Sequence, residues 1–595
     1  MMKRNSVKVE YTWDLSHLYK SEDEYNDDFA KVKEIGKKLE GFHGKLNNKK
    51  NILEEFKLSS KLSRIVDRMQ IYISLKKERN GTDVVALEQI EEFSNWATDF
   101  DQKTAYISVE LSKLDDKFID ELIKDKDFSN FTISLKDLKE YKKHILDQKS
   151  EEMLSQIYSF TNFSEIFSKL DDIELKFGEI KLDDGKVVQV TNDNYGLFMH
   201  NGSQRVRKDV FTVLHDGFKG FNLTISENFI NFLKSQNVFA KLRNFESAID
   251  SAMFSSKVDK KVLDQVISEV NKHLVDFYKY QKTLKKVLDL KTFYNSDVYA
   301  PVNTTKHKLY EYEQAKVLVK NALCVLGEEY NQKLQFLLDN RTIDVYPTEN
   351  KGGGGFSTSC YDVHPYILLN YNGTYNDVST LAHELGHSMH SVMSNLHQVY
   401  EKAGYKIFVA EIASTVNEIL LFSYMEKHTK NNNERLEFIA SFLSNFYATV
   451  FRQTMFSEFE LYAHTLVNKN QVVSYDKLNT YYGELQKKYF GDGVKMLDNA
   501  KYEWSRIPHF YRPFYVFKYA TGFISACSIV QNILTKGQDY VDNYYMKFLS
   551  AGASADPVDI LKLAGVDICD SKTYDSAFAL FNHYIDEFSL IGGNK

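Results

Sequence analysis

Proline is missing from the first three hundred positions of this 595-residue chain, and that absence limits the fold more than any other feature. All six prolines lie between Pro301 and Pro557. Proline interrupts helices because it has no backbone N–H and its ring clashes with the preceding turn. In the proline-free half, long stretches carry apolar residues at helical spacing with lysine and glutamate between them. These stretches, which predict a mostly α-helical protein, are Glu22–Leu46, Leu53–Arg79, Ala86–Leu114 and Lys136–Phe160.

Two short segments interrupt the helical pattern. Ile180–Val190 predicts a β-hairpin, because an Asp-Gly turn pair lies between two β-branched runs. Tyr366–Tyr371 predicts a strand, which either binds a peptide along its edge or belongs to the core. The glycine run Gly352–Gly355 just before it allows either a mobile loop at a site or a plain connection. No Gly-Lys-Ser/Thr follows the run, so it is not a phosphate-binding loop.

The run His383-Glu384-Leu385-Gly386-His387 predicts a metal-binding helix. Two histidines four residues apart lie on one helical face, so both imidazoles can reach one Zn²⁺. The glutamate after the first histidine is placed to act as the general base of metal-assisted hydrolysis. An apolar stripe at helical spacing indicates that this helix is partly buried; it consists of Val378, Leu381, Leu385, Met389 and Val392. A helix that merely carries two hydrogen-bonded histidines is the simpler alternative.

A third ligand is needed to complete such a site. His390 lies seven residues beyond His383, about 10 Å along a straight helix, which is too far for all three imidazoles to converge. Glu411 is the better candidate, because it stands alone among small and apolar neighbours, which is unusual for a surface glutamate. Glu418 follows on the same helical face, where it can accept a hydrogen bond from a ligating imidazole. An amphipathic helix with ordinary charges remains the alternative for Glu411.

Several segments together resemble oligoendopeptidase F, a bacterial branch of the thimet-oligopeptidase-like zinc metallopeptidases. They are spread over essentially the whole chain: Trp13–Leu15, Tyr366–Thr374, His383–Ser391, Ala410–Glu418, Arg506–Tyr511, Phe514–Gly522 and Asp556–Leu561. The resemblance implies that Glu411 is the third ligand, completing one Zn²⁺ site per chain with His383 and His387. It also implies a multi-helix fold with a small β element beside the active-site helix and a deep substrate channel. An N-terminal helical domain over residues 1–200 and a catalytic domain over 201–595 are expected.

An aromatic cluster near the C-terminus is the candidate for holding the oxyanion of the scissile carbonyl. His509, Tyr511 and Tyr515 are the candidate catalytic donors, with Tyr519 close by. From spacing alone such a cluster is more often core than catalytic. Related enzymes use a histidine and tyrosines from this region, which favours the catalytic interpretation. Phe517 departs from the family pattern, which carries a tyrosine there.

Composition fits a large globular enzyme and excludes other classes. Hydrophobic residues make up 43% of the chain, enough for a core, and a net charge of −7 argues against nucleic-acid binding. No window approaches eighteen consecutive apolar residues and the N-terminus lacks the apolar segment of a secretory signal, so we expect a cytoplasmic protein outside the membrane. The four cysteines have no CxxC pairing, which makes a disulfide framework unexpected. Oligomeric state has no signature in the sequence.

The sequence therefore predicts a zinc-dependent endopeptidase that hydrolyses short oligopeptides with Glu384 as general base. Two alternatives remain open. A helical zinc carboxypeptidase with an HExxH motif would need a group for the substrate's C-terminal carboxylate. An inactive peptide-binding homologue is disfavoured because the three ligands and Glu384 are all present.

Overall fold

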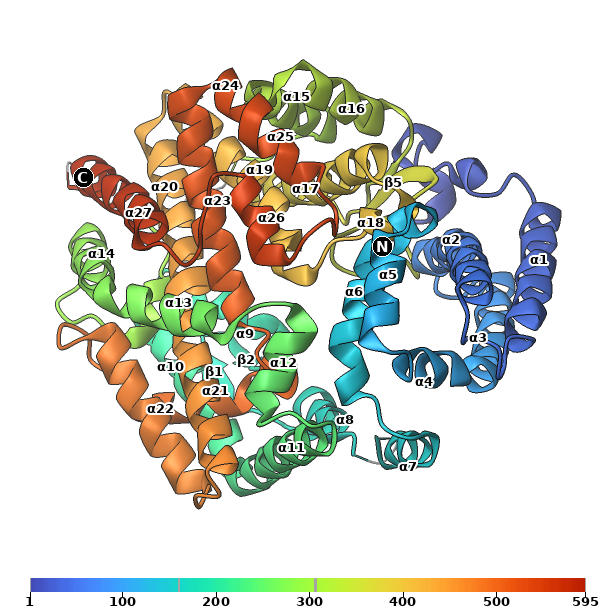
Figure 1. Cartoon of the computed structure of the whole chain (residues 1–595). Helices are drawn as coiled ribbons and strands as arrows, with labels where there is room; N and C mark the ends of the chain where they lie inside the picture. The colour runs from blue at the N-terminus through green and yellow to red at the C-terminus, as the bar shows by residue number, and fades with distance from the viewer. Residues whose placement is uncertain (1, 159–160, 304–307, 594–595) are drawn as a thin grey trace. The chain divides into compact units, whose positions relative to one another are not determined.

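The computed structural model describes residues 2–158, 161–303 and 308–593 and is mostly helical, as predicted (Figure 1). The chain forms two compact units, each assembled from three segments. Unit 1 comprises Met1–Met153, His307–Leu421 and Asn532–Gly565; unit 2 comprises Leu154–Lys306, Phe422–Gln531 and Val566–Lys595. These units do not test the predicted division at residue 200, which stays a prediction.

Unit 1 contains the helices of the N-terminal third and those around the His-Glu-Leu-Gly-His motif. They are α1 (Glu22–Glu40), α2 (Lys49–Arg79), α3 (Val84–Thr104), α4 (Tyr106–Ser112), α5 (Asp116–Lys124), α6 (Thr132–Tyr141), α15 (Tyr312–Leu323), α16 (Gly327–Asp339), α17 (Tyr375–His397), α18 (Tyr400–Ala403), α24 (Gln538–Tyr540), α25 (Met546–Leu549) and α26 (Pro557–Leu563). A three-stranded sheet also belongs to unit 1, with β3 (Ile343–Asp344), β4 (Phe356–Cys360) and β5 (Val363–Leu368).

Unit 2 contains most of the remaining helices and the small hairpin. They are α8 (Phe163–Lys169), β1 (Glu179–Lys181), β2 (Val187–Gln189), α9 (Asn192–Met199), α10 (Gln204–Gly220), α11 (Asn222–Leu242), α12 (Ala248–Ser256), α13 (Lys260–Lys272), α14 (Leu274–Val287), α20 (Asn432–Phe446), α21 (Arg452–Asn468), α22 (Tyr475–Phe490) and α27 (Ser571–Gly592). Three helices contain a unit boundary: α7 (Gln148–Tyr158), α19 (Ile407–His428) and α23 (Phe517–Lys536).

Side-chain caps set where the first helices begin. Ser21, Asn48 and Asp83 each accept a backbone N–H three residues later, at the starts of α1, α2 and α3. Such caps satisfy N–H groups that have no partner inside the helix. The three helices (blue in Figure 1) bury their apolar faces in one core, which reaches Tyr366 and Leu368 of the sheet. The sheet is thereby fixed to the helical part of unit 1.

The predicted helical stretches are largely confirmed, with two interruptions. Ala86–Leu114 is divided at Ala105 between α3 and α4. The stretch over residues 136–160 is broken by a short 3₁₀ turn, Lys142–His144, between α6 and α7, and residues 159–160 lie outside the described part. The hairpin is confirmed: Ile180 pairs with Val188, and Gly185 has a φ of 87°.

The sheet contradicts one prediction about peptide binding. Its strand order is β3-β5-β4, so β5 is central, parallel to β3 and antiparallel to β4. The N–H groups of Leu369 and Tyr371, which follow β5, are also bonded, to the carbonyls of Asp344 and Val345. At Ile367 and Leu368 neighbouring strands lie on both sides of β5, which contradicts the alternative that this strand binds a peptide along a free edge and favours the alternative that it belongs to the core. The edge strands of this sheet are β3 and β4.

One helix in the described residues, α19, is long and apolar enough by composition to cross a membrane. Its most apolar window has a mean hydropathy of 1.4 and is 72% buried within the protein. Burial of this extent is what a core helix of a folded protein shows, because its apolar side chains contact protein atoms.

Candidate metal centre

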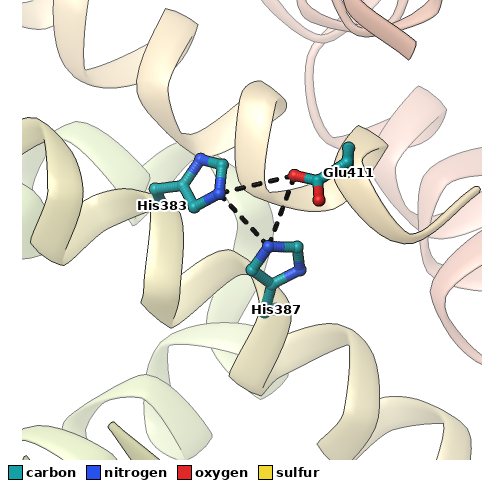
Figure 2. Close-up of side chains that lie close together, drawn as sticks. All are labelled: His383, His387 and Glu411. Carbon is teal, nitrogen blue, oxygen red and sulfur yellow. Dashed lines mark hydrogen bonds and ion pairs between the residues drawn. The ribbon is translucent and has the colours of Figure 1, made fainter. Parts of the chain in front are cut away.

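Helix α17 presents His383 and His387 on one face, one turn apart. Its start is set by a capping box, in which Thr374 accepts the N–H of Asp377 and the Asp377 side chain accepts the N–H of Thr374. Four residues of the predicted stripe are fully buried and anchor the opposite face: Val378, Leu381, Leu385 and Met389. The two Nε2 atoms of the histidines then lie 3.2 Å apart (Figure 2).

Glu411 on α19 completes a group of three ligand atoms. Its Oε2 lies 3.5 Å from Nε2 of His383 and 3.5 Å from Nε2 of His387 (Figure 2). Ligand atoms around a tetrahedral ion with bonds of about 2.1 Å are about 3.4 Å apart. The three side chains are each between a fifth and a third exposed, so one side of the group is open. In the described part of the chain this is the group that can hold a metal ion.

Gly386 lets α19 approach α17 closely enough to bring Glu411 to the histidines. A Cβ at this glycine would lie 2.5 Å from Cα of Ser414 and 2.7 Å from the carbonyl oxygen of Ala413. The contact is fixed by Asn417, whose amide donates to the carbonyl of Ala382 at 3.1 Å and accepts from the hydroxyl of Tyr330 at 3.0 Å. The helix cost of a central glycine is thus explained by packing.

Glu418 sets the orientation of the first imidazole. Nδ1–H of His383 donates to Oε1 of Glu418 at 2.5 Å, and the hydroxyl of Ser379 donates to Oε2 at 3.2 Å. With Nδ1 carrying the proton, Nε2 of His383 has its lone pair directed to the group with Glu411. This is the contact predicted for Glu418 from its helical spacing.

The electrostatics of the group favour a cation. Burial alone would lower the pKa of His383, but Glu411 and Glu418 raise it to about 10. Burial likewise works against ionised Glu411, yet the two imidazoles hold the pKa of its carboxyl well below the ordinary value. Negative charge concentrated at a partly buried point is stabilised by any positive charge there, and a metal ion can replace the protons.

Glu384 lies beside the group without belonging to it. Its side chain is 6% exposed and has no hydrogen-bond partner among the described residues. Burial raises the pKa of Glu384, and the nearby Glu411 and Glu418 add to the rise while the two histidines oppose it. A carboxylate with a raised pKa and a free face can accept a proton near neutral pH.

The glycine run passes directly next to Glu384. A Cβ on Gly355 would be 3.1 Å from Cγ2 of Thr380 and 3.7 Å from Oε1 of Glu384. Gly354 has a φ of 73°, a conformation that favours glycine. The run therefore borders the metal centre, and a side chain in place of Gly355 would crowd the carboxylate.

Lys351 anchors that run and was not identified from the sequence. Its fully buried ammonium forms an ion pair with Asp344 at 2.8 Å and donates to the carbonyls of Tyr346 and Leu369 at 2.8 and 2.5 Å. Asn370 holds the next turn by donating to the carbonyls of two of the glycines at 2.9 Å. The loop beside Glu384 is thus fixed by buried polar contacts. The sequence indicates this anchor only through the position of Lys351 directly before the glycine run.

His390 does not join the metal group. It is fully buried, its ring is stacked on Tyr405 with centroids 3.8 Å apart, and burial lowers its pKa to about 3. Neither ring nitrogen has a hydrogen-bond partner in the described structure. A neutral, stacked imidazole of this kind is a packing residue.

His509, Tyr515 and Tyr519 form a separate cluster in unit 2. The hydroxyl of Tyr519 is 3.4 Å from Nε2 of His509, and the ring centroids of Tyr515 and Tyr519 are 5.3 Å apart. Burial lowers the pKa of His509, and Arg512 and Arg452 lower it further, so its imidazole is neutral at physiological pH. Neutral imidazole and phenol groups are hydrogen-bond donors of the kind an oxyanion requires.

Tyr511 is not part of that cluster. Its hydroxyl accepts from the amide of Asn228 at 2.9 Å, its ring stacks on Phe167, and only 8% of it is exposed. Burial raises the pKa of its hydroxyl. A catalytic role for Tyr511 stays a prediction, now with a structural alternative.

Glu460 holds the turn that carries Tyr515 and was also missed by sequence reasoning. Its buried carboxyl accepts the N–H of Phe514 at 2.7 Å. Phe514 has a φ of 53°, a left-handed conformation that is unfavourable for an aromatic residue. Burial raises the pKa of Glu460 to about 8, although the N–H of Phe514 and the charge of Lys518 lower it.

Replacing Glu460 with glutamine is expected to raise the melting temperature increasingly as the pH rises. The folded pKa is above the ordinary value of 4.5, so the stability that protonated Glu460 contributes is complete below about pH 4.5 and is lost as the pH approaches about 8. Glutamine keeps the acceptor for Phe514 and cannot ionise. Melting curves from pH 5 to 9 measure the difference, with exposed Glu484→Gln as control. A pH-independent difference would contradict the assignment.

Two helix-borne imidazoles, a carboxylate from a second helix and an adjacent buried glutamate form an arrangement of the kind that metal-dependent peptidases use. Residues 197–580 match the model of peptidase family M3, and residues 110–177 match that of oligopeptidase F. The chain belongs to peptidase family M3.

Known proteins resemble this chain over nearly its full length. It is 33% identical to "Oligopeptidase PepF" of Bacillus subtilis, over 98% of this chain and 88% of that protein. It is 34% identical to an "Oligoendopeptidase F homolog" of Borreliella burgdorferi, over 99% and 100%. The crystal structure of oligoendopeptidase F from Enterococcus faecium has a TM-score of 0.73 at 26% identity, over 96% and 100%. A protein from Chlamydophila abortus reaches 0.92 at 28% identity, over 99% and 100%.

Proposed function

We propose that this protein is a zinc endopeptidase that cleaves short peptides, with Zn²⁺ held by His383, His387 and Glu411. The observation that carries the proposal is the spacing of 3.2 to 3.5 Å among the three ligand atoms, next to a buried, unpaired Glu384. Two imidazoles and one carboxylate are the donor set of catalytic zinc in peptidases, and they leave one position open. Names of the relatives from Bacillus subtilis and Borreliella burgdorferi support oligopeptides as substrates.

When bound, Zn²⁺ acts as a Lewis acid and lowers the pKa of water. The residues of the chain transfer the proton and position the ligands. Glu384 takes the proton of the attacking water on its carboxylate, which the raised pKa favours, and then delivers it to the nitrogen of the leaving amine. Glu418 keeps His383 in the tautomer that coordinates through Nε2. Gly355 leaves the space beside Glu384 free of side-chain atoms.

His509 and Tyr515 are proposed to donate hydrogen bonds to the oxyanion of the scissile carbonyl. Their neutral donors, the neighbouring Tyr519 and the constrained turn at Phe514 support this role. Tyr511 is the weaker candidate, because its hydroxyl already contacts Asn228. The division into residues 1–200 and 201–595, the deep substrate channel and cytoplasmic residence remain part of the proposal.

Metal analysis tests the proposed function directly. We expect about one zinc per chain in active protein, loss of activity with a chelator and recovery when zinc is restored. Glu411→Ala should weaken zinc binding, since it removes one of three ligands. Active protein without a divalent ion, or unchanged zinc affinity in Glu411→Ala, would overturn the proposal. Equal cleavage of peptides with free and amidated C-termini separates an endopeptidase from a carboxypeptidase.

His509→Ala and Tyr515→Phe are each expected to lower kcat by about 10²–10³ with little change in KM, because removal of an oxyanion donor affects mainly the transition state. Zinc content and melting temperature should stay near those of the wild type. Tyr481→Phe is the matched control, since that ring is stacked on Tyr462 in the same unit. If Tyr515→Phe left kcat unchanged and Tyr511→Phe lowered it, Tyr511 and not Tyr515 would be the oxyanion donor.

A further inference from the structure

A pocket of about 550 Å³ lies within unit 1. One wall is a single face of α2, whose lining residues follow helical spacing: Phe56, Ser59, Ser60, Ser63 and Asp67. A second wall comes from the segment 400–406, which contains α18 and leads into α19. The volume is in the range of pockets that bind small molecules.

Tyr405 connects the pocket with the metal centre. Its ring stacks on His390 with centroids 3.8 Å apart, and its hydroxyl lies 2.9 Å from that of Ser391. Both partners are on α17, about one turn beyond His387. Burial raises the pKa of the Tyr405 hydroxyl, and the charge of Glu411 adds to the rise. The same ring therefore borders the pocket and packs on the helix that carries the two histidines.

Two hydroxyls of the pocket give their protons to its two carboxylates. The hydroxyl of Tyr400 donates to Oδ2 of Asp67 at 2.7 Å, and the hydroxyl of Ser60 donates to Oε1 of Glu401. A hydroxyl has one hydrogen, so both oxygens have only lone pairs left for a ligand. These four side chains thus offer acceptors to a molecule in the pocket.

Neither carboxylate is neutralised by a cation. Among the described residues, no lysine, arginine or histidine lies within ion-pair distance of Asp67 or Glu401. Burial raises the pKa of Asp67, although the hydrogen bond from Tyr400 lowers it. Both carboxylates are only half-buried, so a ligand can reach them. The described lining includes one lysine, Lys406, whose side chain is exposed.

Aromatic rings supply the apolar part of the pocket. Phe56, Tyr400 and Tyr405 line it, and each is partly exposed. Lysine and arginine side chains carry a charged head on an apolar stem, and aromatic faces attract cations. Rings together with two unpaired carboxylates suit a cation on an apolar stem and disfavour an anion.

We propose that this pocket binds a positively charged group of the substrate peptide at Asp67 and Glu401, and so selects which peptides are cut efficiently. The group is an ammonium or guanidinium, from a lysine or arginine side chain or from the N-terminus. Tyr400 and Ser60 hold the two carboxylates in place by their hydrogen bonds. This inference rests on the proposed peptidase function and adds a substrate preference to it.

Cleavage of matched peptides by the zinc-loaded protein tests the proposal. A neutral reference peptide is compared with variants that carry lysine or norleucine at one position at a time, each with a free or an acetylated N-terminus. Lysine at one position, or the free N-terminus, should raise kcat/KM by about tenfold or more over its neutral counterpart. The peptides that show the preference identify the source of the cation.

The double variant Asp67→Asn, Glu401→Gln should remove this preference, because the amides keep the shape of the side chains but carry no charge. Its matched control is Glu54→Gln, Asp101→Asn, which makes the same change of charge at exposed positions of α2 and α3 outside the pocket and should keep the preference. Glu401→Lys should reverse the preference, so that a glutamate peptide is cut better than the lysine peptide. Zinc content and melting temperature are measured for each variant.

The outcomes separate this inference from the proposed function. Equal kcat/KM for charged and neutral peptides, with both hydrolysed, would overturn the assignment of the pocket and leave the proposed function standing. A preference that the double variant retains would also overturn it, because the cation would then be bound elsewhere. No hydrolysis of any peptide by the zinc-loaded protein would overturn the proposed function and this inference with it.

Discussion

Glu384→Gln should leave zinc content unchanged and lower kcat by at least about 10²–10⁴, the range supplied by a positioned general acid or base. Glutamine has nearly the same shape but cannot accept the proton of the attacking water. Glu384 lies outside the group of three ligand atoms, so its replacement removes no coordination. Initial rates on an oligopeptide, with metal analysis of the same sample, measure both effects.

Glu329→Gln is the matched control for that variant, because Glu329 is an exposed glutamate on α16 in the same unit. It should behave as the wild type. His387→Ala should instead lose both metal and activity. Loss of zinc from Glu384→Gln would make Glu384 a ligand, and near-normal turnover with zinc present would exclude it as the base.

Gly386→Ala is expected to destabilise the protein strongly. The new Cβ would meet backbone atoms, Cα of Ser414 at 2.5 Å and the carbonyl oxygen of Ala413 at 2.7 Å, which cannot rotate away. Overpacking of a well-packed core costs about 1–3 kcal/mol, and more when backbones must separate. Separation of α17 from α19 would also move Glu411 away from His387, so zinc affinity should fall.

Gly196→Ala is the control, since Gly196 is also inside a helix, α9, and a Cβ there would meet nothing within 4 Å. That change should stabilise the protein by about 0.5–1 kcal/mol, because alanine favours helix more than glycine. Melting temperature and zinc affinity of both variants are the measurements. If Gly386→Ala had the same melting temperature as Gly196→Ala and bound zinc normally, α17 and α19 would be able to accommodate the added methyl group without loss of stability, and the prediction would be wrong.

Features that depend on neighbours along the chain were predicted well. The stripe on α17, the spacing of His383 and His387 and the Asp-Gly hairpin follow from helix and strand periodicity. Gly386 is a further local sign, because a glycine inside a helix costs stability and is explained when another segment packs closely against it. The structure shows that α19 packs against Gly386 through Ser414. The residues around Gly386 in the sequence do not identify this partner.

The position of β5 in its sheet likewise depends on contacts between distant segments. Residue pattern shows that Tyr366–Tyr371 is extended, but strand order depends on pairing with β3 and β4, and each pairing joins segments that the sequence does not relate. The residues of this segment therefore do not predict whether other strands lie on both of its sides.

Single buried polar residues were the hardest to predict. Lys351 and Glu460 each contact segments that are distant in the sequence, and a single lysine or glutamate looks like any other in a sequence. By itself the sequence determined the helical class, the motif helix and the types of its candidate ligands, because these follow from short-range periodicity and side-chain chemistry. The tertiary structure alone decided the distances among the ligand atoms, the central position of β5 in its sheet and the burial of those polar groups, because burial and approach are properties of packed segments.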